Sequence, residues 1–314
     1  MKKSLSLILA LLLFTSLVAC DVTTPSDTIT TNPSTDQTTN STNTNEATTT
    51  VSNEETSAQN KEEISFSEMV VIDNNECTIK ITGIDPDNFW GYTLKVQLEN
   101  KSSDKTYMFS VTNAAINGVQ CDPYFATEVA AGKKANKEIN FSDDNFEENG
   151  ITDYTDIEIS FRVYDSNDWN ADDIATKTVH VYPYGESKAT KYVRAPQDSD
   201  TLLIDNEYVS VIVTGYENDS IWGYTVKLFL LNKTNKNVMF SVNEASVNGY
   251  MADPFYAKSV MAGKAAFGSM SWSNTTLEEN GITTVEEIEF SLRVHDDDDW
   301  LADDLVKQTI TLKP

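Results

Sequence analysis

Apolar and polar residues alternate along several stretches of this chain. The alternating stretches are residues 77–82, 92–99 and 157–164, followed by 209–213, 224–230 and 288–294. A period of two places neighbouring side chains on opposite faces of a β-strand, so that one face packs on a core and the other meets water. This pattern is typical of antiparallel sheet. The chain is therefore predicted to be all-β.

The same order of motifs occurs twice. Residues 107–126 (YMFSVTNAAINGVQCDPYFA) return as residues 238–257 (VMFSVNEASVNGYMADPFYA), and both copies continue through Ala-Gly-Lys, Glu-Glu-Asn-Gly-Ile, Arg-Val and Asp-Trp-x-Ala-Asp-Asp. A repeat of this length indicates two homologous domains rather than a solenoid of small units. We expect these domains at 62–184 and 201–314, each large enough for its own core, with a linker at 185–200.

Turn and cap signals separate the predicted strands. Asn117-Gly118 suits the positive φ angles of a tight hairpin, and a short helical turn is expected at 142–148 with Ser142 as its cap. About seven to nine short strands in each copy favour an immunoglobulin-like β-sandwich. The predicted fold class is thus two tandem immunoglobulin-like β-sandwich domains, although the Cys-Trp-Cys core of antibody domains is absent.

Residues 1–19 have the form of a lipoprotein signal peptide. Two lysines precede the apolar run 7–14, which is too short to be interpreted first as a membrane-spanning helix. The ending Leu-Val-Ala-Cys looks like a bacterial lipobox, in which Cys20 receives lipid such as palmitate and becomes the first mature residue. An ordinary signal peptide with an incidental cysteine is the alternative. The prediction is an exported protein, lipid-anchored to the outer face of the cell membrane.

Residues 20–61 are rich in Thr, Ser and Asn and hold almost nothing apolar to bury. Such a segment cannot offset the entropy lost on ordering, so it is predicted to be a disordered tether. The chain is also strongly acidic, with a formal net charge of −26. That charge argues against a nucleic-acid partner and against docking to anionic lipid headgroups. A monomer is expected.

The ordered motifs, standing behind a lipobox and a Thr/Ser tether, resemble uncharacterised lipoproteins of Gram-positive bacteria. The shared run is Met-Phe-Ser-Val, Asn-Gly, Asp-Pro, Ala-Gly-Lys, Glu-Glu-Asn-Gly-Ile and Arg-Val. Those proteins carry tandem immunoglobulin-like, telokin-like extracellular domains. The resemblance covers both copies and includes no catalytic motif, so it implies location and fold rather than an activity.

Two acidic turns are candidate cation sites. The carboxylates concerned are Asp165, Asp168, Asp172 and Asp173 in the first copy, and Asp296, Asp298, Asp303 and Asp304 in the second. Closely spaced carboxylates can surround Ca²⁺, which takes six to eight oxygen ligands. The spacing matches no EF-hand loop. The favoured interpretation is therefore a solvated acidic turn, with Trp169 and Trp300 folded back onto the sandwich, and the Ca²⁺ site is the alternative.

The cysteines of the first copy have no counterpart in the second. Val209 replaces Cys77 and Ala252 replaces Cys121. Their joint loss is what a disulfide pair would show, and an exported compartment permits oxidation. Replacement by small apolar residues instead fits free buried thiols. Both alternatives give the cysteines a structural role.

An enzyme is not predicted. The two histidines occupy different places in the copies, since His180 aligns with Thr311 and His295 with Tyr164. No repeated Ser-His-Asp, Cys-His or His-based metal set can therefore be assembled within a domain. No cofactor is expected apart from the Ca²⁺ alternative.

Aromatic residues are the remaining candidates for ligand contact. The alternation that places Tyr92 and Tyr224 on the core face predicts a core position for Trp90 and Trp222 as well. The Asp-Pro-aromatic-aromatic segments follow a turn, so one ring of each pair is a candidate anchor for a protein or glycan ligand. Those candidates are Tyr124, Phe125, Phe255 and Tyr256.

The sequence thus predicts a non-catalytic, lipid-anchored surface protein that acts in binding or envelope organisation. A Ca²⁺-dependent adhesion module using the acidic turns is the first alternative. An envelope enzyme with a cleft shared between the domains is the second.

Overall fold

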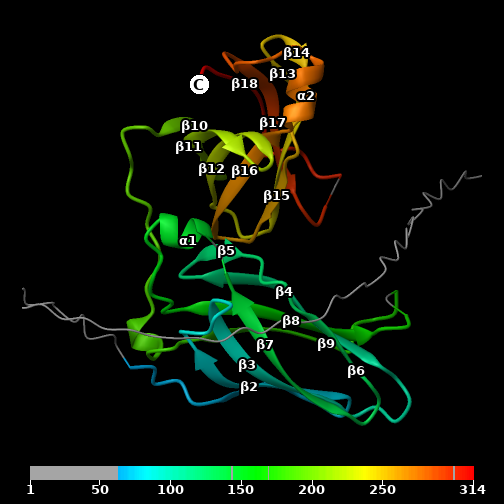
Figure 1. Cartoon of the computed structure of the whole chain (residues 1–314). Helices are drawn as coiled ribbons and strands as arrows, with labels where there is room; N and C mark the ends of the chain where they lie inside the picture. The colour runs from blue at the N-terminus through cyan, green and yellow to red at the C-terminus, as the bar shows by residue number, and fades with distance from the viewer. Residues whose placement is uncertain (1–62, 143, 169, 300) are drawn as a thin grey trace, which may run out of the picture. The chain divides into compact units, whose positions relative to one another are not determined.

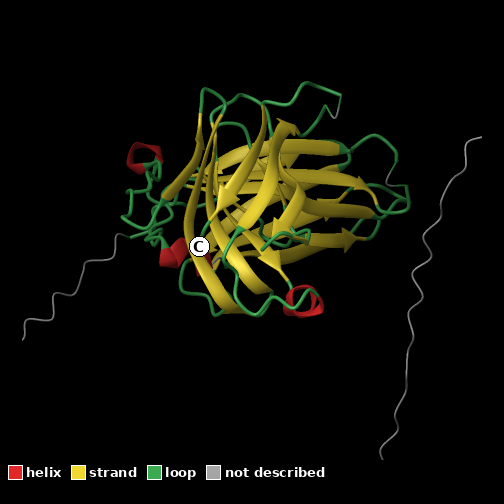
Figure 2. Ribbon diagram, turned by 90° about the horizontal axis from the view of Figure 1, so that it is seen from above, coloured by secondary structure: helices red, strands yellow, loops and turns green. Residues whose placement is uncertain are grey.

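The computed structural model describes residues 63–142, 144–168, 170–299 and 301–314. The predicted signal peptide, Cys20 and the tether, together with Trp169 and Trp300, lie outside the described residues. Strands make up almost all of the regular structure (Figure 2). Among the described residues, no helix is long and apolar enough to cross a membrane.

Each half of the described chain has nine strands and one short α-helix. The first half contains β1 (Met69–Asp73), β2 (Cys77–Asp85), β3 (Tyr92–Asn100), β4 (Tyr107–Ile116), β5 (Val119–Cys121), β6 (Ala126–Val129), β7 (Lys134–Phe141), α1 (Asp144–Glu148), β8 (Ile157–Asp165) and β9 (Ala175–Val181). The second half contains β10 (Thr201–Asp205), β11 (Val209–Ser220), β12 (Gly223–Asn232), β13 (Val238–Val247), β14 (Tyr250–Met251), β15 (Ala257–Val260), β16 (Ala265–Trp272), α2 (Asn274–Glu279), β17 (Ile288–Asp296) and β18 (Val306–Leu312). All six alternating stretches lie within strands, as predicted.

Strand pairing follows the same order in the two halves (Figure 1). The sheet β1-β2-β3-β7 corresponds to β10-β11-β12-β16, and β4-β8-β9 corresponds to β13-β17-β18. Beside β4 lie β5 and β6, as β14 and β15 lie beside β13. One parallel bridge, from Val119 to Ala265, joins a sheet of each half, so the described strands form three sheets.

A shared apolar core lies between the two sheets of each half. In the first half, Ile79 and Leu94 from one sheet join Phe109 and Phe161 from the other, each at most 1% exposed. The corresponding cluster of the second half draws on the equivalent strands. Along β8 buried and half-buried positions alternate at every residue, which confirms the period-two prediction. Each half is therefore sandwich-like.

The Asn-Gly hairpins form as predicted. Asn117 and Gly118 have φ angles of 51° and 81°, and Asn248 and Gly249 have φ angles of 50° and 80°. The Asn117 side chain also donates to the Asp153 carbonyl at 2.7 Å, and Asn248 makes the same kind of bond. Both copies thus keep Asn for the turn and for fixing a distant loop.

The linker residues 185–200 lie outside the strands, apart from a short 3-10 turn at Glu186–Lys188. Tyr192 donates its backbone N–H to the Asn117 carbonyl at 2.8 Å, and its ring contacts those of Phe229 and Phe267. Arg194 forms a two-pronged ion pair with Asp200, at 2.7 and 2.8 Å. The linker therefore packs on residues of both halves.

One face of the second half differs in polarity from its counterpart. The positions concerned are Ile212, Phe229, Leu231 and Phe267 in the second half, and Lys80, Gln97, Glu99 and Asn136 in the first. These four apolar side chains pack with the core cluster of the first half. Beside them, the Gln120 side chain donates to the Ser259 carbonyl and accepts from the Met261 N–H, at 3.1 and 2.7 Å. The second half has apolar residues where the first half has polar ones because this face of the second half is packed against the first half.

Candidate functional site

A tight turn before β12 brings Trp222 to the surface. Trp222 is 70% exposed and Trp90 is 66% exposed, so the predicted core position of both is wrong. The alternation stops because Gly91 and Gly223 have φ angles of 98° and 89°, which turn the chain ahead of the strand. Tyr224 is buried, as its alternation predicts.

Gly223 allows this turn to lie directly against the end of β16. A Cβ atom at Gly223 would stand 2.1 Å from the Trp272 carbonyl oxygen and 2.8 Å from the Asn274 nitrogen. No side chain fits at that distance, so only glycine permits the contact. Gly223 thus sets the backbone of the turn from which Trp222 projects.

One ring of each Asp-Pro-aromatic-aromatic segment is exposed. Tyr124 is 95% exposed and Phe255 is 92% exposed, whereas Phe125 is buried and Tyr256 packs against the core of its half. The Phe255 N–H donates to the Ser271 carbonyl at 2.9 Å in an isolated bridge to β16. This bond fixes the backbone beneath the exposed ring.

Trp222 and Phe255 line one cavity of about 430 Å³. Its lining consists of Trp222, Asp253, Phe255, Ser271, Ser273 and Thr276. The volume is in the range of small-ligand sites, which combine apolar walls with a few placed polar groups. The two aromatic rings supply the apolar part, while a carboxylate and three hydroxyls supply the polar part.

The hydroxyl groups of the cavity are held by hydrogen bonds. Ser271 Oγ lies 2.9 Å from Thr225 Oγ1, which in turn lies 2.9 Å from Ser220 Oγ. Ser273 Oγ accepts from the Thr276 N–H at 3.1 Å as the N-cap of α2. Such fixed hydroxyls both donate and accept, which suits an uncharged polar ligand.

Sequence reasoning found Phe255 but missed the polar part of the lining. Asp253, Ser271, Ser273 and Thr276 meet only because β12 pairs with β16 and the Phe255 segment bridges to β16. The available signal was repetition, since Asp253 and Ser273 recur in the first copy as Asp122 and Ser142.

The first half keeps similar residues in a different arrangement. Asp122 is ion-paired with Lys258 at 2.6 Å. The cavity beside Tyr124 measures about 300 Å³, and Trp90 does not line it. Trp272 in the second half donates its indole N–H to the Ala252 carbonyl at 2.8 Å. Phe141 takes its place in the first half and has no such donor.

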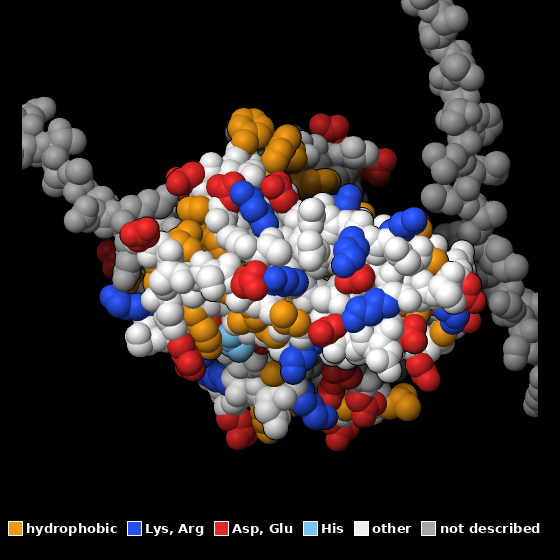
Figure 3. All heavy atoms as spheres, turned by 90° about the horizontal axis from the view of Figure 1, so that it is seen from below, with side chains coloured by type: hydrophobic (Ala, Val, Ile, Leu, Met, Phe, Trp, Pro, Cys, Tyr) orange, Lys and Arg blue, Asp and Glu red, His pale blue; other side chains and the backbone are white. Residues whose placement is uncertain are grey.

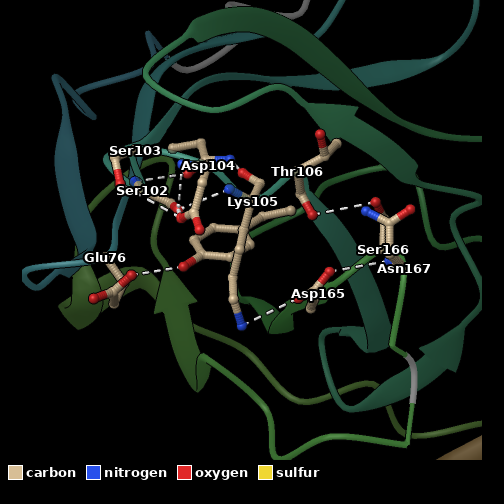
Figure 4. Close-up of polar contacts among 11 residues, drawn as sticks. Glu76, Ser102, Ser103, Asp104, Lys105, Thr106, Asp165, Ser166 and Asn167 are labelled. Carbon is tan, nitrogen blue, oxygen red and sulfur yellow. Dashed lines mark hydrogen bonds and ion pairs between the residues drawn. The ribbon is translucent and has the colours of Figure 1, made fainter.

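Four aspartates of the acidic turns form ion pairs with Lys or Arg side chains. Asp165 pairs with Lys105 at 3.2 Å, and the two side chains point toward each other (Figure 4). The other three pairs are Asp296 with Lys236 at 2.5 Å, Asp173 with Arg162 at 2.7 Å, and Asp304 with Arg293 at 2.6 Å. The remaining predicted ligands, Asp168, Asp172, Asp298 and Asp303, are exposed.

These contacts add no support for the Ca²⁺ alternative. Within the described ranges, no group of three or more His, Cys, Asp or Glu residues is arranged to hold a metal ion. The physical reason is that four of the eight carboxylates are already neutralised by Lys or Arg from a neighbouring strand or loop. Each turn is thereby fastened to the sheet beside it.

The ion pairs give the fold an expected acid sensitivity. The Lys236 ammonium lowers the pKa of Asp296. The pKa of Asp165 is lowered by two groups, first the backbone N–H of Asn167, which donates a hydrogen bond to it, and then the Lys105 ammonium. A carboxyl with a lowered folded pKa stabilises the fold above its unfolded pKa of about 3.8, and this contribution is lost as pH falls through the folded pKa.

We therefore expect the melting temperature to decrease as pH falls below about 4. The substitution Lys236→Met should make that decrease shallower, because Asp296 then has a folded pKa closer to its unfolded value. Thermal melts of both proteins from pH 7 to pH 3 measure the difference, with Lys307→Met at an exposed site as the control. Equal pH dependence in the wild type and Lys236→Met would contradict this account.

Cys77 and Cys121 are both buried, and no disulfide joins them to each other. The disulfide alternative is therefore not what the structure shows, and both thiols belong to the core of the first half. Burial raises the pKa of Cys77 to about 11, which disfavours the reactive thiolate.

The histidines lie on different strands, as their alignment predicts. His180 Nδ1 on β9 is 2.7 Å from Asp156 Oδ1, and its ring stacks on that of Tyr182. His295 is a buried residue of β17.

On the face drawn in Figure 3, acidic and basic side chains are interspersed.

Comparisons with known proteins identify no family for this chain. No family model matches it, and no curated protein matches it. Among solved structures, the YadV chaperone matches with a TM-score of 0.23 and 11% identity, over 70% of this chain and 92% of that one. Red sea bream transglutaminase matches with a TM-score of 0.21 and 11% identity, over 79% of this chain and 31% of that one. Both are distant likenesses between mostly-β proteins, and no functional conclusion is drawn from them.

Proposed function

We propose that this chain is a non-catalytic, lipid-anchored surface protein that binds an extracellular ligand through its exposed aromatic residues. The observation that carries the proposal is the cavity of about 430 Å³ between Trp222 and Phe255. Large exposed aromatic side chains beside fixed polar groups are typical of recognition surfaces. The partner is a protein or a glycan, and the net charge of −26 disfavours nucleic acid.

The strand order supports two tandem immunoglobulin-like domains, at 62–184 and 201–314. In such sandwiches, strands A, B and E share one sheet while C, F and G form the other. The pairings β2-β3-β7 and β4-β8-β9 follow that order, with β1 added at the edge beside β2. The second half repeats it with β11-β12-β16 and β13-β17-β18. The protein acts as a monomer in this proposal.

Anchoring rests on the lipobox-like ending at Cys20, and its test is direct. In cells that express the full chain, the protein is expected in the membrane fraction, and Cys20→Ala is expected to release it or to leave it unprocessed. Mass spectrometry of the mature N-terminus should find a lipidated Cys20. An unlipidated residue at that terminus would overturn the anchoring part of the proposal.

The binding role is tested with isolated cell envelopes. A chain that begins after Cys20, and therefore carries no lipid, should bind sedimented envelopes, and the paired substitution Trp222→Ala with Phe255→Ala should abolish most of that binding. Both side chains are exposed, so the pair should leave the melting temperature almost unchanged. Envelope binding that is unaffected by the paired substitution would reject the aromatic surface as the ligand site.

A further inference from the structure

We propose that the cavity between Trp222 and Phe255 binds an uncharged glycan built of β-linked pyranose rings. This inference rests on the proposed function, because it names the ligand class of the same surface. It goes further by assigning a role to the polar residues Asp253, Ser271, Ser273 and Thr276.

The two aromatic rings match the apolar face of a sugar. A β-linked pyranose with equatorial hydroxyls exposes flat patches of C–H groups above and below its ring. Trp222 and Phe255 are 70% and 92% exposed, and both line the same cavity. Covering such rings removes a large apolar area from water, and the electron-rich ring face attracts polarised C–H groups.

The remaining lining matches the hydroxyl rim of a sugar. Asp253 is exposed and offers carboxylate oxygens that accept hydrogen bonds from sugar hydroxyls. The hydroxyls of Ser271 and Ser273 are held in place by Thr225 and Thr276. Each pyranose carries several hydroxyl groups that both donate and accept, which matches the fixed hydroxyls that line this cavity together with the two aromatic rings.

Charge restricts the ligand to an uncharged glycan. The six lining residues include one carboxylate and no Lys, Arg or His. The whole chain carries a net charge of −26. A polyanionic glycan would meet repulsion at long range and no cation in the cavity.

The site is built before a ligand arrives. Gly223 holds the Trp222 turn against β16, and the Phe255 N–H is bonded to Ser271. The Trp272 indole N–H fixes the Ala252 carbonyl next to Asp253. Because the backbone that carries both rings is already ordered, no backbone entropy needs to be lost there on binding.

The first half provides an internal control. Its Trp90 and Tyr124 have nearly the same exposure as Trp222 and Phe255. Its Asp122, however, forms an ion pair with Lys258, and Trp90 does not line the cavity beside Tyr124. We therefore assign glycan binding to the second half.

The test is a titration of the full chain with cellohexaose and chitohexaose, followed by calorimetry and tryptophan fluorescence. At least one of these two neutral β-1,4 glycans should bind and change the emission. Trp222→Ala and Phe255→Ala should each weaken binding by about tenfold or more, the effect expected for an aromatic anchor. Asp253→Asn should weaken binding by a smaller factor, since it keeps the shape and one acceptor.

The matched controls are Trp90→Ala and Tyr124→Ala, which should bind within about twofold of the wild type. Polygalacturonate, an anionic glycan, should not bind. The inference is overturned if neither hexasaccharide binds, or if Trp90→Ala weakens binding as much as Trp222→Ala. Envelope binding that still depends on Trp222 in that case would leave the proposed function standing with a different ligand.

Discussion

Replacing Asn232 with alanine is expected to lower the free energy of unfolding by about 3–5 kcal/mol, among the larger effects of single substitutions. Asn232 is fully buried at the end of β12. Its amide nitrogen donates to the carbonyls of Lys236, Val260 and Met261 at 2.7–3.0 Å. Its side-chain oxygen accepts from the backbone and hydroxyl of Thr234. Alanine would remove all of these bonds and take the amide donor away from the carbonyls of the buried residues Val260 and Met261.

Chemical denaturation of Asn232→Ala measures this effect. The control is Asn235→Ala, at an exposed position three residues away, which should change stability by less than about 0.5 kcal/mol. Asn232→Asp should be at least as harmful as alanine, because a carboxylate oxygen takes the place of the donor nitrogen and faces three carbonyl oxygens. A loss below about 1 kcal/mol for Asn232→Ala would contradict the assigned role.

Asn100 provides a second test of the same feature. It is also fully buried, and it bonds the carbonyls of Lys105 and Val129, each at 2.8 Å. Its oxygen accepts from the Ser102 N–H at 2.9 Å. The two copies thus use one buried asparagine each to hold the loop that follows the strand, and Asn100→Ala should destabilise the first half in the same way.

The second large effect is expected for Gly223→Ala. Its Cβ would overlap the Trp272 carbonyl oxygen, and its φ angle of 89° is one that side-chain-bearing residues rarely adopt. Together these terms should lower the free energy of unfolding by about 2–4 kcal/mol. The turn that carries Trp222 must also shift, so glycan affinity should decrease in the protein that remains folded.

Gly215→Ala is the matched control for this substitution. Gly215 lies on β11, and a Cβ there would have no atom within 4 Å. Its φ angle is not in the left-handed region, so alanine should be neutral or stabilise the fold by about 0.4–1 kcal/mol. Urea denaturation of both variants gives the comparison. Equal stability of Gly223→Ala and the wild type would mean that the turn does not need the close contact.

The sequence was enough to predict the strands and hairpins. Alternation identified β2, β3 and β8 with their counterparts, and the Asn-Gly pairs have the predicted positive φ angles. Both signals are local, since they depend on neighbouring residues and on backbone geometry. The pairing between strands is not local, and for that reason the meeting of Asp253 with Ser271 and Ser273 escaped prediction.

One sequence interpretation was wrong for an identifiable reason. Alternation was extended across Gly91 and Gly223, where a positive φ angle changes which way Trp90 and Trp222 face. Spacing along the chain also does not reveal the basic partners of the acidic turns, because these come from elsewhere in the chain, as Lys105 does for Asp165. Comparing the two copies would have exposed part of this, because Lys105 recurs as Lys236.

The most direct test of the glycan site is the tryptophan indole region of a ¹⁵N–¹H spectrum of the full chain. The chain has five tryptophans, and a Trp222→Phe variant assigns the Trp222 signal by its absence. On addition of the hexasaccharide that binds, the Trp222 indole signal should move with saturation, while the Trp90 signal stays in place. A moving Trp90 signal with a stationary Trp222 signal, or no movement of either, would contradict the account.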